Sequence, residues 1–322
     1  MKNKYIFVLL LLFSITVVCS VGTFFYVKLN NETVASDDEI LVMTSCNPVY
    51  IATLNVLDGV DGYRVENLSQ PTTGCLHDYT LTTEDMKKLS KADYLVVNGG
   101  GMEGYLDDVI SAYPELQIID TYEEIEHSFI DSEPPFITEE EHDHEESDEV
   151  SHHHDHGDSN SHIWMDDEIF RYQVAAIAMG IEPNPNREDK LISNNMLAYT
   201  KKLEAEIDKQ GLDKTMANQN VAILHEAFAY TAQSLGANVV ATMDLDEERQ
   251  VSAGEVSEFL DEIREHDVKI VFAEYDYGKS MGDLIEEQTD AKVVYLETLV
   301  HGSYSKDDYI KVMNENYRKI KE

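Results

Sequence analysis

The sequence predicts an α/β protein with two lobes, each a parallel-type sheet flanked by helices, joined by one long rigid backbone helix. Three observations lead to this prediction. Short apolar runs of strand length alternate with helical patterns in both halves of the chain, as in parallel sheets covered on both faces. One long helical pattern separates the halves. A chain of 322 residues is also long enough for two domains of ordinary size.

The chain starts with a segment that predicts export. Lys2 and Lys4 precede an apolar run over residues 5–27 that could cross a bilayer as a helix, with its amino end in the cytoplasm. A cleaved signal peptide fits equally well. Lipid attachment at Cys19 is a third alternative, although "TVVC" lacks the small residue normally found before a lipidated cysteine. We assign residues 1–36 to the signal or anchor and its linker, and expect the rest at the cell surface, attached by an N-terminal helix or lipid.

The first lobe is expected over residues 37–185. Its strands are the short apolar runs "EILVMTSC", "DYLVVNGGG" and "LQIIDT". Between the first two, "TEDMKKLSKA" predicts a helix that starts after a threonine. The stretch "NGGGME" lacks the lysine and hydroxyl residue of a nucleotide site. Close packing of the chain is therefore the better explanation of its glycines.

An acidic, histidine-rich segment over residues 139–158 interrupts this lobe. It contains ten acidic residues and almost nothing apolar, so it cannot offset its ordering entropy and we expect it to be mobile. We interpret it as an auxiliary capture arm of weak, fast-exchanging metal ligands rather than the principal site. Its six histidines are His142, His144, His152, His153, His154 and His156.

After this segment we expect an ordered helical region over the amphipathic stretch "HIWMDDEIFRYQVAAIAMGI". A long helix follows over residues 187–210, inside a connecting segment of residues 186–212, with "GL" as its stop. In the second lobe, residues 213–322, the strands "NVAIL", "VKIVFAEYD" and "AKVVYLETL" alternate with helical patterns. A small ligand is expected in a cleft between the lobes, at the carboxyl ends of the strands.

The net charge of the chain limits the classes of partner that it can bind. It carries 63 acidic and 24 basic residues, for a formal net charge of -39. Nucleic acid is excluded as a partner, because phosphate binding needs the opposite sign. The charge fits a well-hydrated extracellular protein that attracts cations.

Four histidines outside the acidic segment lie at predicted strand or helix ends. His77 lies in a Pro- and Gly-containing loop, His162 at a loop-to-helix boundary, and His225 and His301 each follow a strand. Two come from each half of the chain. Neutral imidazoles so placed could converge on one ion and close a tetrahedral zinc shell. Taken singly, a histidine at a strand end is more often a hydrogen-bonded surface residue.

Several stretches occur in an order that resembles one family. They are "TSCNPVY", "PTTGCLHDYTLTTEDMKKLSKADYLVVNGGGME", "SHIWMD", "LHEAFAYTAQSLG", "VFAEYDYGKSM" and "AKVVYLE". Together they resemble the cluster A-I solute-binding proteins of zinc and manganese ABC importers, over residues 39–320. The resemblance implies two lobes bridged by a rigid helix with one ion between them. It also implies a monomeric, non-enzymatic carrier that delivers Zn²⁺ to an ABC transporter membrane permease.

The same resemblance implies a ligand set. His77 of "HDYTLT" matches the first ligand, His162 of "HIWMD" the second, and His225 of "LHEAF" the third, where manganese-type relatives tend to carry glutamate. Three imidazoles favour Zn²⁺ over Mn²⁺, which prefers more oxygen. The fourth position varies in the family. His301 is the predicted fourth ligand, with Glu297 or a water as the alternative.

Carboxylates near the predicted ligands are candidates for an outer layer of the site. A metal-binding imidazole usually donates its other N–H to a carboxylate or carbonyl group. Asp78, Glu226 and Glu274 are near the ligands by sequence or strand position. Ordinary solvated acids are an equally good interpretation of all three.

Cys46 and Cys75 are the cysteines of the exported part. Outside the cytosol they could form a disulfide, which would stiffen the loop that carries His77. Two separate buried thiols, or one thiolate that binds metal, are the alternatives.

Three other functions are alternatives to zinc delivery. A manganese-specific carrier is the nearest alternative, and a surface adhesin or zinc-scavenging protein is another, although no separate adhesive module is present. A zinc hydrolase would keep one coordination position open beside a general base. The sequence has no "HExxH" on a helix, so we predict that the protein is not an enzyme.

Overall fold

The computed structural model describes residues 39–69, 79–129, 137, 160–181, 190–207, 209, 211–245 and 251–322. The chain divides into two compact units, Met1–Glu39 and Ile40–Glu322, and every element named below belongs to the second. The predicted membrane run at residues 5–27 and the acidic segment at residues 139–158 lie outside the described residues. Across the described ranges, no helix is long and apolar enough to cross a bilayer.

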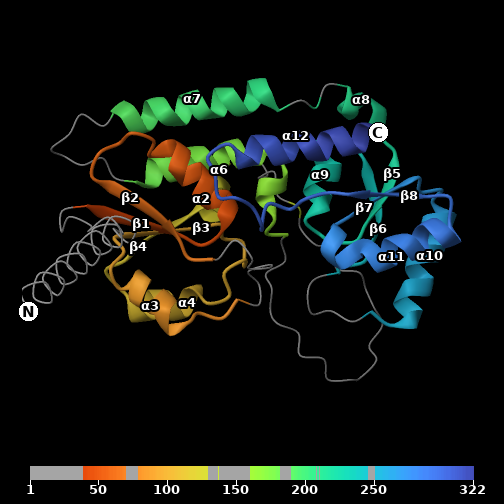
Figure 1. Cartoon of the computed structure of the whole chain (residues 1–322), viewed down its shortest axis with the longest axis horizontal. Helices are drawn as coiled ribbons and strands as arrows, with labels where there is room; N and C mark the ends of the chain where they lie inside the picture. Colours follow the sequence, from red (N-terminus) through yellow and green to blue (C-terminus); the bar gives the residue numbers. More distant parts are fainter. Residues whose placement is uncertain are drawn as a thin grey trace, which may run out of the picture. The chain divides into compact units, whose positions relative to one another are not determined.

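The first half of the chain forms a four-stranded parallel sheet (Figure 1). Its strand order is β2-β1-β3-β4, with β1 (Ile40–Thr44), β2 (Tyr63–Asn67), β3 (Tyr94–Val97) and β4 (Gln117–Asp120). Helices cover both faces, so β3 is buried at every position. They are α2 (Asn47–Val56), α3 (Thr83–Leu89), α4 (Leu106–Ala112), α5 (Thr121–Ser128) and α6 (Asp167–Gly180).

Successive residues of β1 serve the two faces of this sheet. Leu41 and Met43 belong to the core formed with α3 and α4, whereas Val42 belongs to the core formed with α2 and α6. This follows from the strand geometry, since successive side chains point to opposite faces. A strand that is covered on both faces must be apolar throughout, which is why "ILVM" reads as one continuous run.

The second half repeats the plan (Figure 1). Its parallel strands follow the order β6-β5-β7-β8, with β5 (Asn220–Ile223), β6 (Asn238–Thr242), β7 (Ile270–Ala273) and β8 (Lys292–Tyr295). The helices of this half are α8 (Leu212–Met216), α9 (Phe228–Ser234), α10 (Ala253–Glu265), α11 (Tyr275–Gln288) and α12 (Asp308–Lys321). In both sheets the first strand lies beside the third, so chain connections diverge there. Ligands of open α/β sheets bind at such points, outside the carboxyl ends of the strands.

Local capping explains where two of the predicted helices begin. Thr82 accepts a hydrogen bond from the backbone N–H of Asp85, and the Asp85 carboxylate accepts one from the backbone N–H of Thr82. Ser252 and Glu255 form the same reciprocal capping box at the start of α10. Each box satisfies backbone donors that the first helical turn leaves unpaired.

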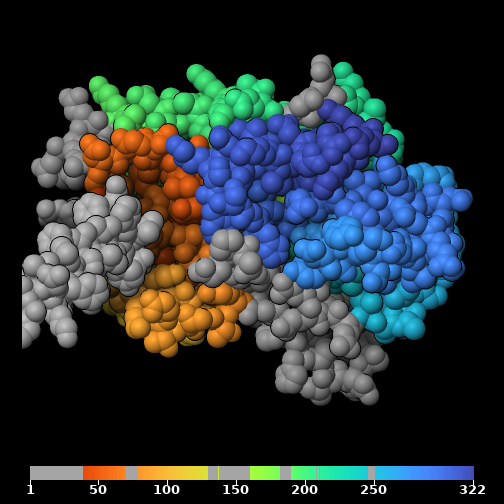
Figure 2. All heavy atoms as spheres, viewed as in Figure 1, coloured from red at the N-terminus to blue at the C-terminus, as the bar shows by residue number. Residues whose placement is uncertain are grey.

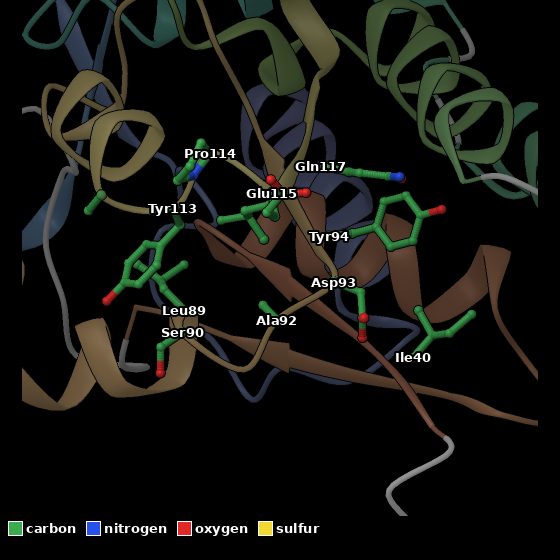
Figure 3. Close-up of a pocket in the computed structure, with 12 residues that line it drawn as sticks. Ile40, Leu89, Ser90, Ala92, Asp93, Tyr94, Tyr113, Pro114, Glu115 and Gln117 are labelled. Carbon is green, nitrogen blue, oxygen red and sulfur yellow. The ribbon is translucent and has the colours of Figure 1, made fainter.

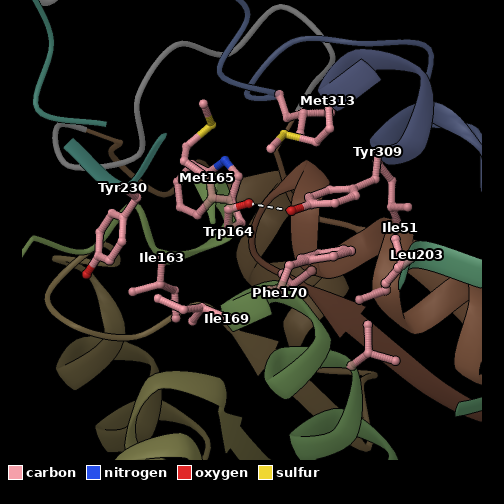
Figure 4. Close-up of a cluster of buried hydrophobic side chains, with 14 of the residues drawn as sticks. Ile51, Ile163, Trp164, Met165, Ile169, Phe170, Leu203, Tyr230, Tyr309 and Met313 are labelled. Carbon is pink, nitrogen blue, oxygen red and sulfur yellow. Dashed lines mark hydrogen bonds between the residues drawn. The ribbon is translucent and has the colours of Figure 1, made fainter. Parts of the chain in front are cut away.

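One of the hydrophobic cores contains residues of both halves. A single cluster of buried side chains contains residues of β1, β3, α6 and β5 and of the C-terminal helix α12. Tyr309 of α12 stacks on Phe170 of α6 (Figure 4). Their ring centroids are 3.6 Å apart. The Tyr309 hydroxyl donates a hydrogen bond of 2.7 Å to the backbone carbonyl of Trp164. The chain therefore returns to the first half after completing the second sheet.

Helix α7 (Lys190–Glu206) lies within residues 187–210, where one long helix is predicted. Its Asn195 amide donates to the backbone carbonyls of Val56 and Asp58 at the end of α2. In the space-filling view α7 (green) lies along the blue C-terminal helix (Figure 2), and the Asn314 amide of α12 donates to the Glu206 carbonyl. The predicted fold class, two parallel sheets flanked by helices, is confirmed. A long rigid helix that joins the two lobes stays a prediction, as do the lobe limits at residues 37–185, 186–212 and 213–322.

Candidate metal centre

Two predicted ligands, His162 and His225, lie side by side in the interior. Their ring centroids are 4.9 Å apart and their planes are inclined by 80°. His162 is fully buried and His225 is 5% exposed. His162 immediately precedes the short 3₁₀ helix Ile163–Met165, and His225 follows β5 after one intervening residue. The fold thus brings together one imidazole from each half of the chain.

The position of His162 is set by the end of β3. The side-chain amide of Asn98, the residue after β3, donates a hydrogen bond of 2.7 Å to the carbonyl of Ser161. Gln173 of α6 donates to the Asn98 side-chain oxygen at 2.9 Å. The Asp166 carboxylate then accepts from two backbone N–H groups in the first turn of α6. His162 is therefore held between a strand end and a capped helix.

Two oxygen atoms face one ring nitrogen of His162. Its Nδ1 lies 3.1 Å from a carboxylate oxygen of Glu226 and 3.2 Å from the side-chain oxygen of Asn160. A ring with its proton on Nδ1 would donate to these acceptors. The lone pair would then lie on Nε2, the nitrogen that could bind a metal.

His225 has an equivalent partner in the second half. Its Nδ1 lies 2.9 Å from Glu274 Oε2, and Glu274 directly follows β7 as the N-cap of α11. The Thr298 hydroxyl donates a hydrogen bond of 2.5 Å to the other carboxylate oxygen, Oε1. Both oxygens of Glu274 are thus engaged, and the carboxylate is held in one orientation against His225.

The ionisation of Glu274 reflects this pairing. Burial acts to raise its pKa, but the hydrogen bond and charge of His225 act in the opposite direction. The hydrogen bond from Thr298 and the charge of His162 add to the lowering. The net result is a pKa below the ordinary value, so the group is a carboxylate that can stabilise a cation nearby.

Trp164 connects this centre to the second half. Its ring centroid lies 5.2 Å from that of His162, and its indole N–H donates a hydrogen bond of 2.7 Å to the Thr298 carbonyl. Thr298 is also the donor to Glu274. The single tryptophan of the chain is therefore built into the candidate centre and can report on it.

His301 and Glu297, the two candidates for the fourth ligand, lie in the segment after β8. His301 is half-buried; two residues earlier the Leu299 carbonyl accepts from the Asn47 amide of α2 at 2.8 Å. The Glu297 carboxylate is exposed and lies 3.9 Å from Lys319 Nζ of α12. Both assignments stay predictions.

His77, Cys75 and the six histidines of the acidic segment lie outside the described residues. Cys46 is buried at the N-cap of α2. Because Cys75 lies outside the described residues, the Cys46–Cys75 disulfide stays a prediction. The described part of the chain contains no group of three or more His, Cys, Asp or Glu side chains that could hold a metal ion. The predicted set needs His77 in addition to the His162–His225 pair.

Sequence reasoning identified some neighbours of the histidines and missed others. Glu226 and Glu274 were candidates, and both contact an imidazole in the structure. Asn160 and Thr298 were not anticipated, because their roles depend on tertiary contacts. The available signal for Asn160 was its place in "SNSHIWMD", two residues before a predicted ligand.

The glycine-rich stretch after β3 packs closely, as predicted. A Cβ on Gly99 would lie 1.9 Å from Asp120 Oδ1, and one on Gly100 would lie 2.6 Å from the ring of Tyr122. Both glycines also have positive φ angles, a conformation that costs other residues energy. The turn lets Asn98 reach the Ser161 carbonyl, which is its contribution to the candidate centre.

A separate hollow lies at the opposite edge of the first sheet. It has a volume of about 520 Å³, and Ile40, Tyr94 and Gln117, the first residues of β1, β3 and β4, line it (Figure 3). The Asp93 carboxylate at this edge accepts a hydrogen bond from the backbone N–H of Leu41. None of the predicted metal ligands contributes to its lining. The candidate centre is therefore at the carboxyl ends of the strands and this hollow at their amino ends.

Comparisons with known proteins identify the family and the fold of the chain. A family model described as "Zinc-uptake complex component A periplasmic" matches residues 42–322. The chain is 26% identical over 288 residues to the "High-affinity zinc uptake system protein ZnuA" of Yersinia pestis, covering 85% of this chain and 88% of that protein. It is 22% identical over 246 residues to the "Manganese-binding lipoprotein MntA" of Halalkalibacterium halodurans, covering 74% of each. The same fold occurs in the solved structure of the "SBP FpvC" of Pseudomonas aeruginosa with Ni²⁺, with a TM-score of 0.71, 20% identity and coverage of 88% and 95%.

Proposed function

The chain belongs to the zinc-uptake complex component A family, and we propose from this that it is the metal-binding component of an ABC importer. In this role it captures Zn²⁺ outside the cytoplasm, holds the ion between its two halves and delivers it to a membrane permease. The relatives named for zinc uptake and for manganese binding support a metal as the cargo. Zinc is the cargo that the side chains of this chain favour.

The His162–His225 pair carries this proposal. Two buried imidazoles from different halves face each other across 4.9 Å, and each has a carboxylate on Nδ1. Metal-binding histidines are usually oriented by a carboxylate or carbonyl on the other ring nitrogen, which also makes the binding nitrogen more basic. Imidazole nitrogen suits Zn²⁺, whereas Mn²⁺ prefers oxygen ligands.

The complete shell in this proposal adds His77 and His301 to the pair, with Glu297 as the alternative to His301. Four protein ligands would leave no open position for a substrate or an activated water. A closed shell of this kind fits an ion that is carried, and it does not fit a hydrolytic zinc. The chain would be exported and attached to the cytoplasmic membrane through its N-terminal segment.

Zinc titration of the full-length protein tests the proposal, with Trp164 fluorescence as the signal. We expect one tight site, confirmed by metal analysis of the protein after dialysis. His162→Ala and His225→Ala should each weaken zinc binding by more than the about 10–100-fold that loss of an outer partner costs. Loss of an actual ligand removes a coordination bond as well as its orientation.

His266→Ala is the matched control. His266 also lies beside a glutamate, with its Nε2 3.1 Å from Glu262 Oε2, but both side chains are exposed on α10. Its substitution should leave the tight site unchanged. If His162→Ala and His225→Ala bind zinc as tightly as the parent protein, the proposed centre is wrong.

Selectivity provides a separate test. His225→Glu replaces a nitrogen ligand with oxygen and places a second carboxylate beside Glu274. We expect zinc affinity to fall and the preference for zinc over manganese to drop roughly tenfold or more. Parallel titrations with Zn²⁺ and Mn²⁺ measure this ratio. An unchanged ratio would mean that position 225 does not select the metal.

A further inference from the structure

Asn160 makes contacts on both sides of the histidine pair. Its side-chain oxygen accepts a hydrogen bond of 3.0 Å from the backbone N–H of His162 and lies 3.2 Å from His162 Nδ1. Its side-chain amide donates a hydrogen bond of 2.8 Å to the carbonyl of Glu226, the residue after His225. One side chain thus joins a predicted ligand of the first half to the residue beside a predicted ligand of the second half.

The backbone of Asn160 is held as firmly as its side chain. Its N–H donates to the Ile137 carbonyl at 2.9 Å, and its carbonyl accepts from the Tyr230 hydroxyl of α9 at 2.7 Å. The Tyr230 hydroxyl also accepts a hydrogen bond of 3.2 Å from the backbone N–H of Ile137. Asn160 is 4% exposed and Tyr230 is fully buried. Because four atoms of Asn160 make these contacts, its side-chain oxygen has a defined position relative to His162.

The side-chain amide of Asn160 influences which tautomer the His162 ring adopts. Both acceptors near Nδ1, Asn160 Oδ1 and Glu226 Oε1, favour the form with a proton on Nδ1. The amide NH₂ of Asn160 is engaged with the Glu226 carbonyl, which decides which end of the amide faces the ring. A residue that lacks either the acceptor or the donor could not make both contacts.

We propose that Asn160 is a positioning residue for metal binding, which fixes the tautomer and orientation of His162 and sets its spacing from His225. The proposal rests on the proposed function, because it assigns Asn160 a role in presenting one of the zinc ligands. Asn160 does not touch the ion in this scheme. It acts through His162 on one side and through the backbone beside His225 on the other.

The test compares three variants of the full-length protein. Asn160→Leu keeps the size of the side chain and removes both polar groups. Asn160→Asp keeps the acceptor toward His162 and removes the donor toward Glu226. Tyr230→Phe removes the hydroxyl that holds the Asn160 backbone and leaves the Asn160 side chain in place. Zinc affinity is measured by competition with a chelator, and the histidine tautomers of the metal-free protein by NMR of ¹⁵N-histidine-labelled samples.

We expect Asn160→Leu to weaken zinc binding about 10–100-fold and to change the Nδ1 and Nε2 signals of His162, identified by their absence from His162→Ala. Asn160→Asp should keep the parent tautomer and recover part of the affinity. Tyr230→Phe should cause a smaller loss than Asn160→Leu. The tautomer signals separate positioning from a general loss of stability, which would not alter the ring protonation of a folded protein selectively. If Asn160→Leu does not fold, Asn160→Asp and Tyr230→Phe still decide the question, because unchanged affinity in both would overturn the proposal.

The outcomes distinguish this inference from the function on which it rests. If His162→Ala loses tight zinc binding while Asn160→Leu binds zinc like the parent and keeps the parent tautomer, only the role of Asn160 is wrong. If His162→Ala itself retains tight binding, the proposed metal centre fails and the inference fails with it.

Discussion

Glu274 is the residue through which the second sheet orients His225. Two features fix its position. Glu274 is the residue between β7 and α11, and its carboxylate accepts a hydrogen bond from the Thr298 hydroxyl. The carboxylate presents Oε2 to His225 Nδ1 at 2.9 Å. The charge of Glu274 should therefore strengthen metal binding by His225 without any contact between Glu274 and the ion.

Glu274→Gln tests this role of charge. The amide keeps an acceptor for the imidazole and removes the negative charge, so we expect zinc affinity to fall about 10–100-fold. Glu262→Gln is the control, because Glu262 also faces a histidine, His266, but on the exposed surface of α10. Isothermal titration with zinc measures both variants. Equal affinities for Glu274→Gln and the parent protein would show that the Glu274 charge does not act on the site.

Glu103 supports the turn that positions Asn98. Its carboxylate accepts hydrogen bonds from the Ser45 hydroxyl and from the backbone N–H groups of Asn98 and Gly99. Burial raises its pKa to about 7, although the three hydrogen bonds act to lower it. Because the folded-state pKa is raised above the ordinary 4.5, the associated stabilisation is complete below about pH 4.5. It is lost as the pH rises through about 7.

Glu103→Gln should remove this pH dependence. Between about pH 4.5 and about pH 7 the parent protein should lose on the order of 3 kcal/mol of its free energy of unfolding through Glu103. The glutamine of the variant does not ionise, so the variant lacks this loss. The free energy of unfolding of the parent minus that of Glu103→Gln should therefore decrease between about pH 5 and about pH 8. Urea denaturation of the metal-free proteins measures this difference, with exposed Glu115→Gln as the control. A difference that stays constant or increases with pH would contradict the assignment.

At the scale of elements, α12 joins the end of the chain to the first half. Tyr309 stacks on Phe170 and donates to the Trp164 carbonyl (Figure 4). Trp164 in turn lies beside His162. The last helix therefore supports the segment that carries a predicted ligand.

Tyr309→Phe isolates the hydrogen bond of this contact. The ring stack is kept, but the buried Trp164 carbonyl loses its donor, so we expect the free energy of unfolding to fall by about 1–3 kcal/mol. Tyr275→Phe is the control, because Tyr275 is exposed, and its effect should stay within about 0.5 kcal/mol. Chemical denaturation of the parent protein and of both variants measures these changes. If Tyr309→Phe is as stable as the parent protein, the Tyr309 hydroxyl contributes nothing to stability.

The central strands and the edge strands β4 and β8 could be predicted from the sequence, but the edge strands β2 and β6 could not. β3 is buried at all four positions and reads as "YLVV", whereas β2 is half-buried throughout and contains Arg64 and Glu66. β6 has no fully buried residue. An edge strand can form with less apolar surface, and the polar patterns of β2 and β6 resemble those of loops. Helix α2 also escaped prediction, because seven of its ten residues are buried and it has no clear polar face.

Helix α12 was not predicted either, although its sequence has the apolar spacing of a helix. Its buried side chains include Tyr309, Ile310, Met313, Tyr317 and Ile320, which recur at helical spacing. The histidine pair could be predicted because "HIWMD" and "LHEAF" match the ligand motifs of the family that the sequence resembles. The contacts of Asn160 and Thr298 could not, because they join segments that only the tertiary fold brings together.

At the scale of the whole molecule, the shared core limits how the halves can move. Val42 of β1, Phe170 of α6, Ile223 of β5 and Tyr309 of α12 belong to one buried cluster. A wide opening would expose this cluster to water. We therefore expect metal binding to cause a small rotation and local ordering rather than a large hinge motion, which hydrogen exchange of the metal-free and zinc-loaded forms would show.

Deletion of residues 139–158 separates the acidic segment from the principal site. These residues lie outside the described ranges, and our hypothesis is that they capture zinc weakly for transfer. The deletion should leave one tight zinc per protein and remove weaker binding, because flexible ligands lose ordering entropy when they bind. Stoichiometric zinc titration, combined with metal analysis, measures both the tight and the weak zinc sites. Loss of the tight zinc would place the principal site in the deleted segment.

The most direct test of the central claim is an anomalous-scattering map, at the zinc edge, from crystals of the zinc-loaded full-length protein. We predict a single strong peak about 2.0–2.1 Å from one nitrogen each of His162 and His225, with His77 as a further ligand. The nitrogens should be Nε2, because Glu226 and Glu274 face Nδ1. A zinc peak that contacts neither His162 nor His225 would contradict the account.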